Sequence, residues 1–265
     1  MGTSKSISTP SGGDWSPLKQ DITSHFGGGT PRCTPATLVG RTVQAAGGVG
    51  TVSSTGVSGQ GRRGGGAASG GGARIPRAVS GLGAFGASIA AQGLGEALER
   101  LGLGELRGRP AAEVVARIAE HLSSHADGLD RTLLSGALRD TLLEVANLHD
   151  SLEYQDLAES LESFLEVNGV EGLVEIFLAN IIYDQVWFLV EQWVLKKSQS
   201  NRDTEALRAS VEGACRQLVR DAMSEMKKEG RFDSVGWFGA EGAALARDIV
   251  RDVESRLNGV ANEGA

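Results

Sequence analysis

Apolar side chains recur every three or four residues in six segments of this chain of 265 residues. This spacing places them on one face of an α-helix, and no segment shows the strict alternation of apolar and polar residues that marks a strand. The segments begin near Pro110, Asp130, Tyr154, Val170, Ser200 and Leu245, with Ser200 or Asp203 as the cap of the fifth. The pattern predicts an all-α fold, a helical bundle of about six helices over residues 110–260.

The segment from Val170 to Lys197 is apolar on most of its faces. A helix of this kind packs against neighbours on several sides. Charged residues interrupt it, so it lacks the run of about 18 uncharged apolar residues that is typical of a membrane span: Glu171, Glu175, Asp184 and Glu191. We therefore predict a central buried helix, separated from the helix before it by Asn168 and Gly169.

Residues 1–82 have a different composition, dominated by Gly, Ser, Thr and Ala, with few large apolar residues. Such a segment buries too little apolar surface to offset the entropy lost on ordering. It predicts a long, disordered, Gly-rich N-terminal arm. Residues 83–109 contain leucines at helical spacing, but their glycines weaken a helix. This favours a hinge or a marginal helix between the arm and the bundle.

Charge divides the chain in the same way. Residues 1–95 contain eight basic and two acidic residues, whereas residues 96–265 contain 18 basic and 31 acidic residues. An acidic body repels phosphates, so we expect no direct binding of nucleic acid by the bundle. The pair Arg62 and Arg63, inside a glycine run, fits either an RGG-like nucleic-acid contact or a soluble linker, and the linker is the simpler interpretation. With no secretory signal pattern at the start, we expect a cytoplasmic protein without a membrane segment.

Candidate catalytic and metal-binding residues are few. His121 and His125 are spaced to share a helix face, but no HExxH pattern or neighbouring cysteine accompanies them, so we interpret them as surface histidines. Cys215 falls on an apolar stripe, which predicts an inert buried thiol. Cys33 lies in the arm without an evident basic or histidine partner. The sequence thus predicts a protein that is not an enzyme and that has no metal site or cofactor.

Three aromatic residues lie between the last two predicted helices. Phe232, Trp237 and Phe238 either cap the end of the bundle or anchor a partner protein. We take Trp237 and Phe238 as candidate partner-binding residues, although capping is the more common role of such a cluster.

The first six residues carry the most specific pattern. A glycine at position 2 permits removal of Met1, which would leave an unhindered amine on a tether formed by Thr3, Ser4, Lys5 and Ser6. An α-amine has a pKa near 7.7–8.0 and is far more often unprotonated near neutral pH than a lysine side chain. The same residues also match the M-G-x-x-x-[ST] pattern of N-myristoylation.

This opening, the Gly-rich arm and the stretch Leu103-Gly104-Glu105-Leu106-Arg107-Gly108 before a helical region together resemble the QatB family of bacterial Qat anti-phage systems. The resemblance implies a non-enzymatic defence subunit whose partners are a 7-cyano-7-deazaguanine synthase-like enzyme, an ATPase and a TatD-like nuclease. It further implies that Gly2 is the acceptor to which the synthase-like enzyme joins a deazaguanine base, with Thr3 to Ser6 in the entry channel of that enzyme. Two alternatives remain: an N-myristoylated adaptor, and a nucleic-acid-binding protein that uses the Arg/Gly-rich arm.

Overall fold

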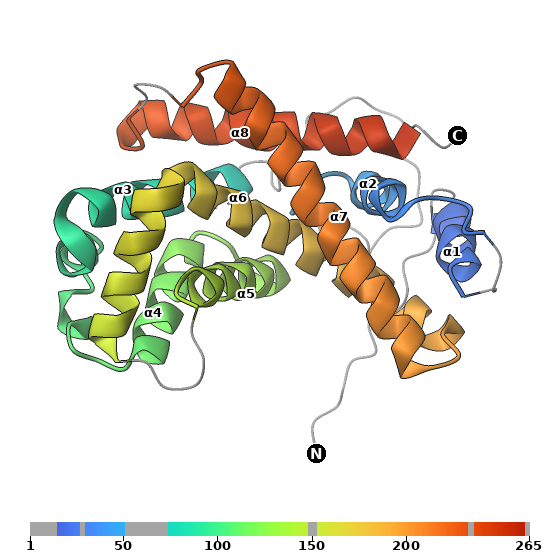
Figure 1. Cartoon of the computed structure of the whole chain (residues 1–265), viewed down its shortest axis with the longest axis horizontal. Helices are drawn as coiled ribbons and strands as arrows, with labels where there is room; N and C mark the ends of the chain where they lie inside the picture. The colour runs from blue at the N-terminus through green and yellow to red at the C-terminus, as the bar shows by residue number, and fades with distance from the viewer. Residues whose placement is uncertain (1–14, 27–29, 51–73, 148–152, 233–235, 263–265) are drawn as a thin grey trace.

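The computed structural model describes residues 15–26, 30–50, 74–147, 153–232 and 236–262. Within these ranges the chain contains helices and no strand, which confirms the all-α class (Figure 1). The helices are α1 (Trp15–Ser24), α2 (Pro35–Ala46), α3 (Arg74–Arg100), a 3-10 turn η1 (Gly104–Leu106), α4 (Ala111–Ser123), α5 (Gly128–Val145), α6 (Tyr154–Lys197), α7 (Asn201–Lys228) and α8 (Gly239–Asn262). The described part of the chain thus has eight α-helices where about six were expected.

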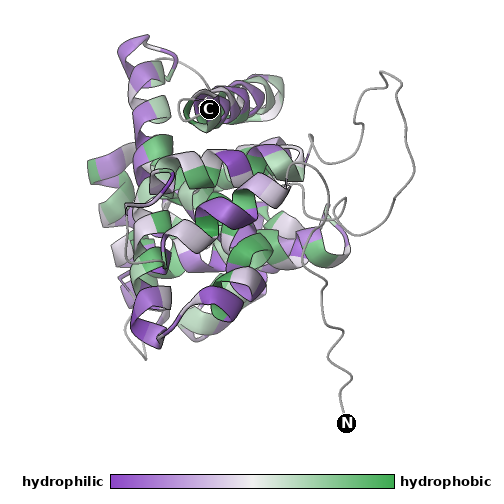
Figure 2. Ribbon diagram, turned by 90° about the vertical axis from the view of Figure 1, so that its right-hand side faces the viewer, coloured by the Kyte–Doolittle hydropathy of each residue, from purple (hydrophilic) through white to green (hydrophobic). Residues whose placement is uncertain are grey.

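Helix α6 is the centre of the bundle, as its apolar faces predicted. Phe177, Leu178 and Ile182 on this helix are completely buried, and α3, α5 and α7 all pack against it. In Figure 1, α8 lies above α6, α4 and α5 lie below it, and α7 crosses in front of it. The surrounding helices are amphipathic, and apolar and polar residues alternate along them in the hydropathy colouring (Figure 2).

The break predicted at Asn168 and Gly169 is confirmed. Gly169 has φ 68° and ψ 179°, which is not a helical conformation, so two helices meet here at a kink. The side-chain amide of Asn168 donates a hydrogen bond to the carbonyl of Phe164, at 3.1 Å, just before the kink. Both helices share the label α6 in Figure 1, where the element bends.

Helix α6 is also long and apolar enough to cross a membrane by length and composition. However, 67% of its most apolar window is buried inside the protein. The core helix of a soluble protein meets the same criterion, and α3, α5 and α7 pack against this helix.

The prediction of a disordered arm over residues 1–82 is wrong for the part of it that the structure describes. Helices α1 and α2 lie within this range, and Leu18, Leu38 and Val39 on them are buried. The Thr34 side chain caps α2 by accepting a hydrogen bond from the backbone N–H of Thr37, and Pro35 occupies the first turn. Composition concealed these helices because their short apolar stripes are flanked by glycine and serine.

The turn after α2 is tied to the bundle by two side chains from distant helices. The buried amide of Gln185 on α6 accepts a hydrogen bond from the N–H of Gly50, at 2.7 Å, and donates one to the carbonyl of Gly48, at 2.9 Å. The carboxylate of Glu254 on α8 accepts from the N–H of Val49, at 3.1 Å. These contacts position α2 against both α6 and α8.

The expectation of a hinge or marginal helix at residues 83–109 is wrong for most of that range. Helix α3 extends to Arg100, with a kink at Gly93, and only residues 101–109 form turns and η1. Leu82, Phe85 and Ile89 are buried in the core. Several glycines of α3 face close neighbours, so tertiary packing outweighs their low helix propensity.

Candidate functional site

The residues that carry the most specific sequence pattern lie outside the described residues. They are Gly2, Thr3, Ser4, Lys5 and Ser6. The Arg62 and Arg63 pair also lies outside them.

The two aromatic residues at the start of α8 have different surroundings. Trp237 is 9% exposed and packs against Gly83 of α3. Phe238 is 50% exposed, and the guanidinium of Arg100 lies 5.8 Å from its ring centroid. The structure accounts for Trp237 as a cap on the bundle and leaves the ring of Phe238 accessible to a partner.

Among the described residues, the histidines and cysteines lie apart from one another except for His25 and Cys33. His121 is exposed on α4, whereas His125 follows the end of that helix and its Nε2 donates a hydrogen bond to the carbonyl of Arg74, at 3.0 Å. The two rings therefore do not share a helix face. Among the described residues, no group of three or more His, Cys, Asp or Glu side chains could hold a metal ion.

The thiols are both buried. Burial raises the pKa of the Cys215 thiol far above its ordinary value, as expected for an inert core cysteine. Cys33 does have a histidine neighbour, contrary to expectation, because its Sγ lies 4.0 Å from Nε2 of His25. Burial, and then the negative charge of Asp21, nevertheless raise the pKa of Cys33 to about 11. Neither thiol is activated as a nucleophile.

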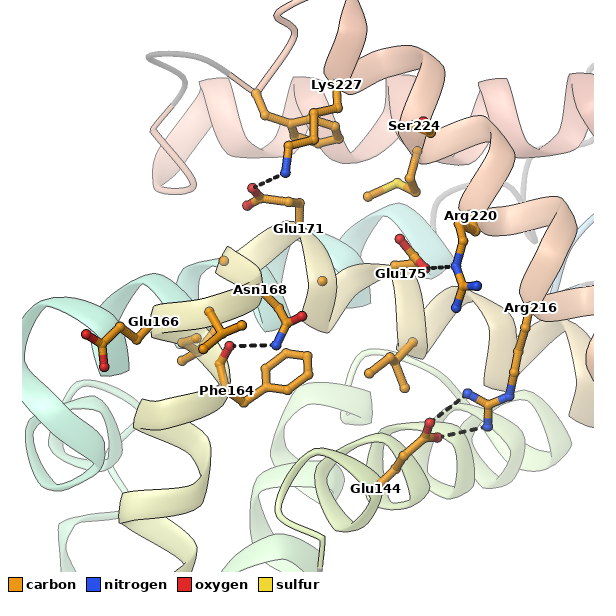
Figure 3. A pocket seen from close by; sticks show the side chains of 17 residues that line it. Glu144, Phe164, Glu166, Asn168, Glu171, Glu175, Arg216, Arg220, Ser224 and Lys227 are labelled. Carbon is orange, nitrogen blue, oxygen red and sulfur yellow. Dashed lines mark hydrogen bonds and ion pairs between the residues drawn. The ribbon is translucent and has the colours of Figure 1, made fainter.

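A groove of about 680 Å³ lies at the kink of α6. Its walls come from both arms of α6, from α7 and from the end of α5 (Figure 3). Phe164, Ile176, Met223 and Phe232 contribute apolar surface. Val167, beside the kink, is 79% exposed.

Three ion pairs connect the walls of this groove. Glu144 of α5 accepts two hydrogen bonds from the guanidinium of Arg216, at 2.6 and 3.0 Å. Glu175 accepts from Nε of Arg220 at 3.2 Å, and Glu171 lies 3.9 Å from Nζ of Lys227 (Figure 3). These ion pairs join α5 and α6 to α7. A charged ligand that entered the groove would have to compete with them.

The sequence analysis did not predict this ladder of pairs. A signal for it exists. Glu171 and Glu175 are four residues apart on α6, and the cations that face them, Lys227 and Arg220, are seven apart and in the reverse order on α7. Both spacings keep side chains on one helix face, and the reversal indicates antiparallel helices.

A second hollow of about 320 Å³ continues along α5, α6 and α7 beyond Glu144 and Arg216. Asp184 and Asp140 line it, and the pKa of Asp184 is raised to about 6 by burial and then by the negative charge of Asp140. Arg208 donates to the hydroxyl of Tyr183 and lies 5.5 Å from the centroid of the Trp187 ring. Asp184 is thus a carboxyl group that changes its charge close to neutral pH.

Comparison with known proteins gives one match. Residues 64–234 match the model of the family described as Qat anti-phage system associated protein QatB. No curated protein and no solved structure matches the chain. The matched range runs from the glycine-rich segment before α3 to the end of α7, and it includes every residue that lines the groove at the kink. Because the match spans more than half of the sequence, this chain belongs to the QatB family and is a component of an anti-phage defence system.

Proposed function

We propose that this chain is a non-enzymatic subunit of its defence system, which binds a 7-cyano-7-deazaguanine synthase-like enzyme and presents Gly2 to it. The observation that carries the proposal is the family match, which places the chain in a system of several components. The N-terminal pattern Met1-Gly2-Thr3-Ser4 adds the chemistry, because removal of Met1 would leave an unhindered α-amine.

A role without catalysis is supported by the state of the described side chains. Six charged groups that line the groove are held in pairs such as Glu144–Arg216, and both thiols have raised pKa values. Such groups are poorly suited to nucleophilic catalysis. The accessible ring of Phe238 offers one contact for a partner. An ATPase and a TatD-like nuclease are the further partners that the family resemblance implies.

We further propose a cytoplasmic protein that contacts neither a membrane nor nucleic acid directly. The burial of α6 in the bundle supports the first part. The excess of acidic over basic residues in 96–265 supports the second part.

The test is an intact mass, with sequencing of the N-terminal peptide, of the protein purified from its own host together with its genomic neighbours. We expect loss of Met1 and an adduct of deazapurine mass on Gly2. A fourteen-carbon acyl mass on Gly2 would instead establish the N-myristoylated adaptor. An unmodified Gly2 would exclude the conjugate.

Two variants connect the modification to defence. Deleting residues 2–6 is expected to abolish protection against phage while the thermal unfolding of the bundle stays unchanged. Gly2→Ala retains removal of Met1, so unchanged protection by this variant would contradict the role of Gly2. Deleting residues 56–72 removes Arg62 and Arg63, and loss of nucleic-acid binding in that variant would favour the nucleic-acid alternative.

A further inference from the structure

A cluster of cations surrounds one tryptophan where α1 meets the end of α6. Trp193 lies in the last turns of α6, and its indole N–H donates to the carbonyl of Lys19, at 3.1 Å, and to the hydroxyl of Thr23, at 3.3 Å. These bonds fix the indole against α1. The ring borders an open hollow of about 430 Å³, which Lys19, Gln20, Thr23, Ser24 and Arg32 also line.

Three ammonium groups share this one ring. The Nζ atoms of Lys19, Lys196 and Lys197 lie 5.2, 5.8 and 5.2 Å from the centroid of the Trp193 ring. Each distance is within the range of a cation–π contact. The like charges of Lys196 and Lys197 at this ring repel each other, and an anion bound beside them would relieve that repulsion.

The two lysines at the end of α6 differ from an otherwise similar pair. Lys196 and Lys197 form no ion pair with any carboxylate in the described ranges. Lys227 and Lys228 occupy the last turn of α7 and pair with Glu171 and Glu225. Both pairs complement a helix dipole. Lys196 and Lys197 differ from the other pair in two ways. Their ammonium groups contact an aromatic ring, and no described carboxylate neutralises them.

We propose that this surface, formed by Trp193, Lys196, Lys197, Lys19 and Arg32, is a docking site for an acidic segment of a protein partner. Carboxylates of such a segment would pair with the ammonium groups of Lys196 and Lys197 and with the Arg32 guanidinium, which donates to the side-chain oxygen of Gln20 at 2.8 Å. The indole positions these ammonium groups through its cation–π contacts. The opposite charges would also accelerate association. This site does not depend on the modification of Gly2.

A peptide fits this surface better than a nucleic acid does. Ammonium groups lie over the Trp193 ring and its N–H is already bonded, so the ring is a poor platform for stacking bases. A nucleic acid would also extend beyond the cluster onto a body that contains 31 acidic and 18 basic residues in 96–265. A short acidic peptide can contact the cluster alone.

The test measures the fluorescence anisotropy of a fluorescein-labelled peptide of repeating Glu-Ala on titration with the full-length protein. The variant Lys196→Glu/Lys197→Glu is compared with Lys227→Glu/Lys228→Glu, which makes the same change in net charge at the end of another helix. We expect the first variant to weaken binding by about tenfold or more and the second by less than about twofold. A Gln-Ala peptide of equal length should not bind. If either Glu variant unfolds early by circular dichroism, the matched pair of Lys→Gln variants replaces both.

Three results would overturn the proposal. The wild-type protein could fail to bind the Glu-Ala peptide at about 0.15 M salt, where charges more than about 8 Å apart are screened. The two variants could weaken binding equally, which would indicate attraction by net charge alone. A labelled oligo-dT of the same length could bind more tightly than the peptide and lose that binding in Lys196→Glu/Lys197→Glu, which would assign the surface to nucleic acid.

Discussion

The ring of Trp237 occupies the space that a side chain on Gly83 would need. A Cβ atom at position 83 would lie 2.0 Å from Cε3 and 2.5 Å from Cζ3 of the indole, far inside van der Waals contact. The indole therefore packs directly on the backbone of α3 and holds the start of α8 against it. The family match ends at residue 234, just before this contact, so Trp237 joins α8 to the part of the chain that defines the family.

We expect Gly83→Ala to lower the free energy of unfolding by about 1–3 kcal/mol, because the added methyl group overpacks a closed contact. Urea unfolding followed by circular dichroism measures this. The matched control is Gly213→Ala on α7, where the added Cβ would have no neighbour within 4 Å. That control should gain up to about 1 kcal/mol from helix propensity. Equal stability of Gly83→Ala and the wild-type protein would show that the indole can leave its place without cost.

The kink of α6 gives a second prediction. Gly169 has φ 68° and ψ 179°, a conformation open almost only to glycine. Gly169→Ala should therefore cost about 1–3 kcal/mol of stability in urea unfolding. Gly259→Ala on α8, whose added Cβ would meet no atom within 4 Å, is the control and should be neutral or stabilising. A neutral Gly169→Ala would mean that α6 can straighten at this point.

Helices α6, α7 and α8 could be predicted because each has sustained apolar positions, whereas the glycines of α3 concealed that long helix. Leu207, Val211 and Cys215 mark the buried face of α7, and Ser200 caps that helix by accepting from the N–H of Asp203 at 3.2 Å. The break between two helices at Asn168 and Gly169 was also predicted in the right place, because glycine is the residue that most readily adopts the φ of 68° seen there.

Helices α1 and α2 could not be predicted from composition, because a few buried residues decide their stability. Their contacts are long-range: Arg41 of α2 pairs with Asp21 of α1 at 2.7 Å and donates to the carbonyl of Ala261 at the end of α8, at 3.2 Å. The Thr34-Pro35 start of α2 is a local signal for the start of a helix, which overall composition does not reveal. The cluster at Trp193 could not be predicted for the same reason, since Lys19 and Lys197 come from distant parts of the chain.

The raised pKa of Asp184, about 6, predicts a pH-dependent contribution to stability. An aspartate in the unfolded chain has a pKa near 3.9, so the folded state binds more protons between about pH 4 and pH 6. The ionised carboxylate therefore destabilises the fold progressively as pH rises through this window. Asp184→Asn should remove that cost, and its stability relative to the wild-type protein should increase from pH 5 to pH 7.

The free energies of unfolding of the variant and of the wild-type protein are measured in urea at the two pH values. Taking the difference between the two proteins cancels the contribution of the histidines. The control is Asp127→Asn at the exposed start of α5, which keeps a residue suited to a helix cap. A difference for Asp184→Asn that changes between pH 5 and pH 7 no more than the difference for Asp127→Asn would contradict the raised pKa of Asp184.

The bidentate contact between Glu144 and Arg216 is expected to contribute little despite its geometry. Both side chains are about one-third exposed, so solvent screens the pair. A double-mutant cycle with Glu144→Ala and Arg216→Ala should give a coupling free energy of about 0.5–1 kcal/mol. The cycle is needed because Arg216 also contacts Glu212 at 3.1 Å, which the single variant would disrupt as well. In 1 M NaCl, where the screening length is about 3 Å, the coupling free energy should fall.

The same cycle on Lys228 and Glu225, whose side chains are about twice as exposed, is the comparison and should give a smaller coupling free energy at low salt. A coupling above about 2 kcal/mol for Glu144 and Arg216 would instead make this pair a principal clamp between α5 and α7.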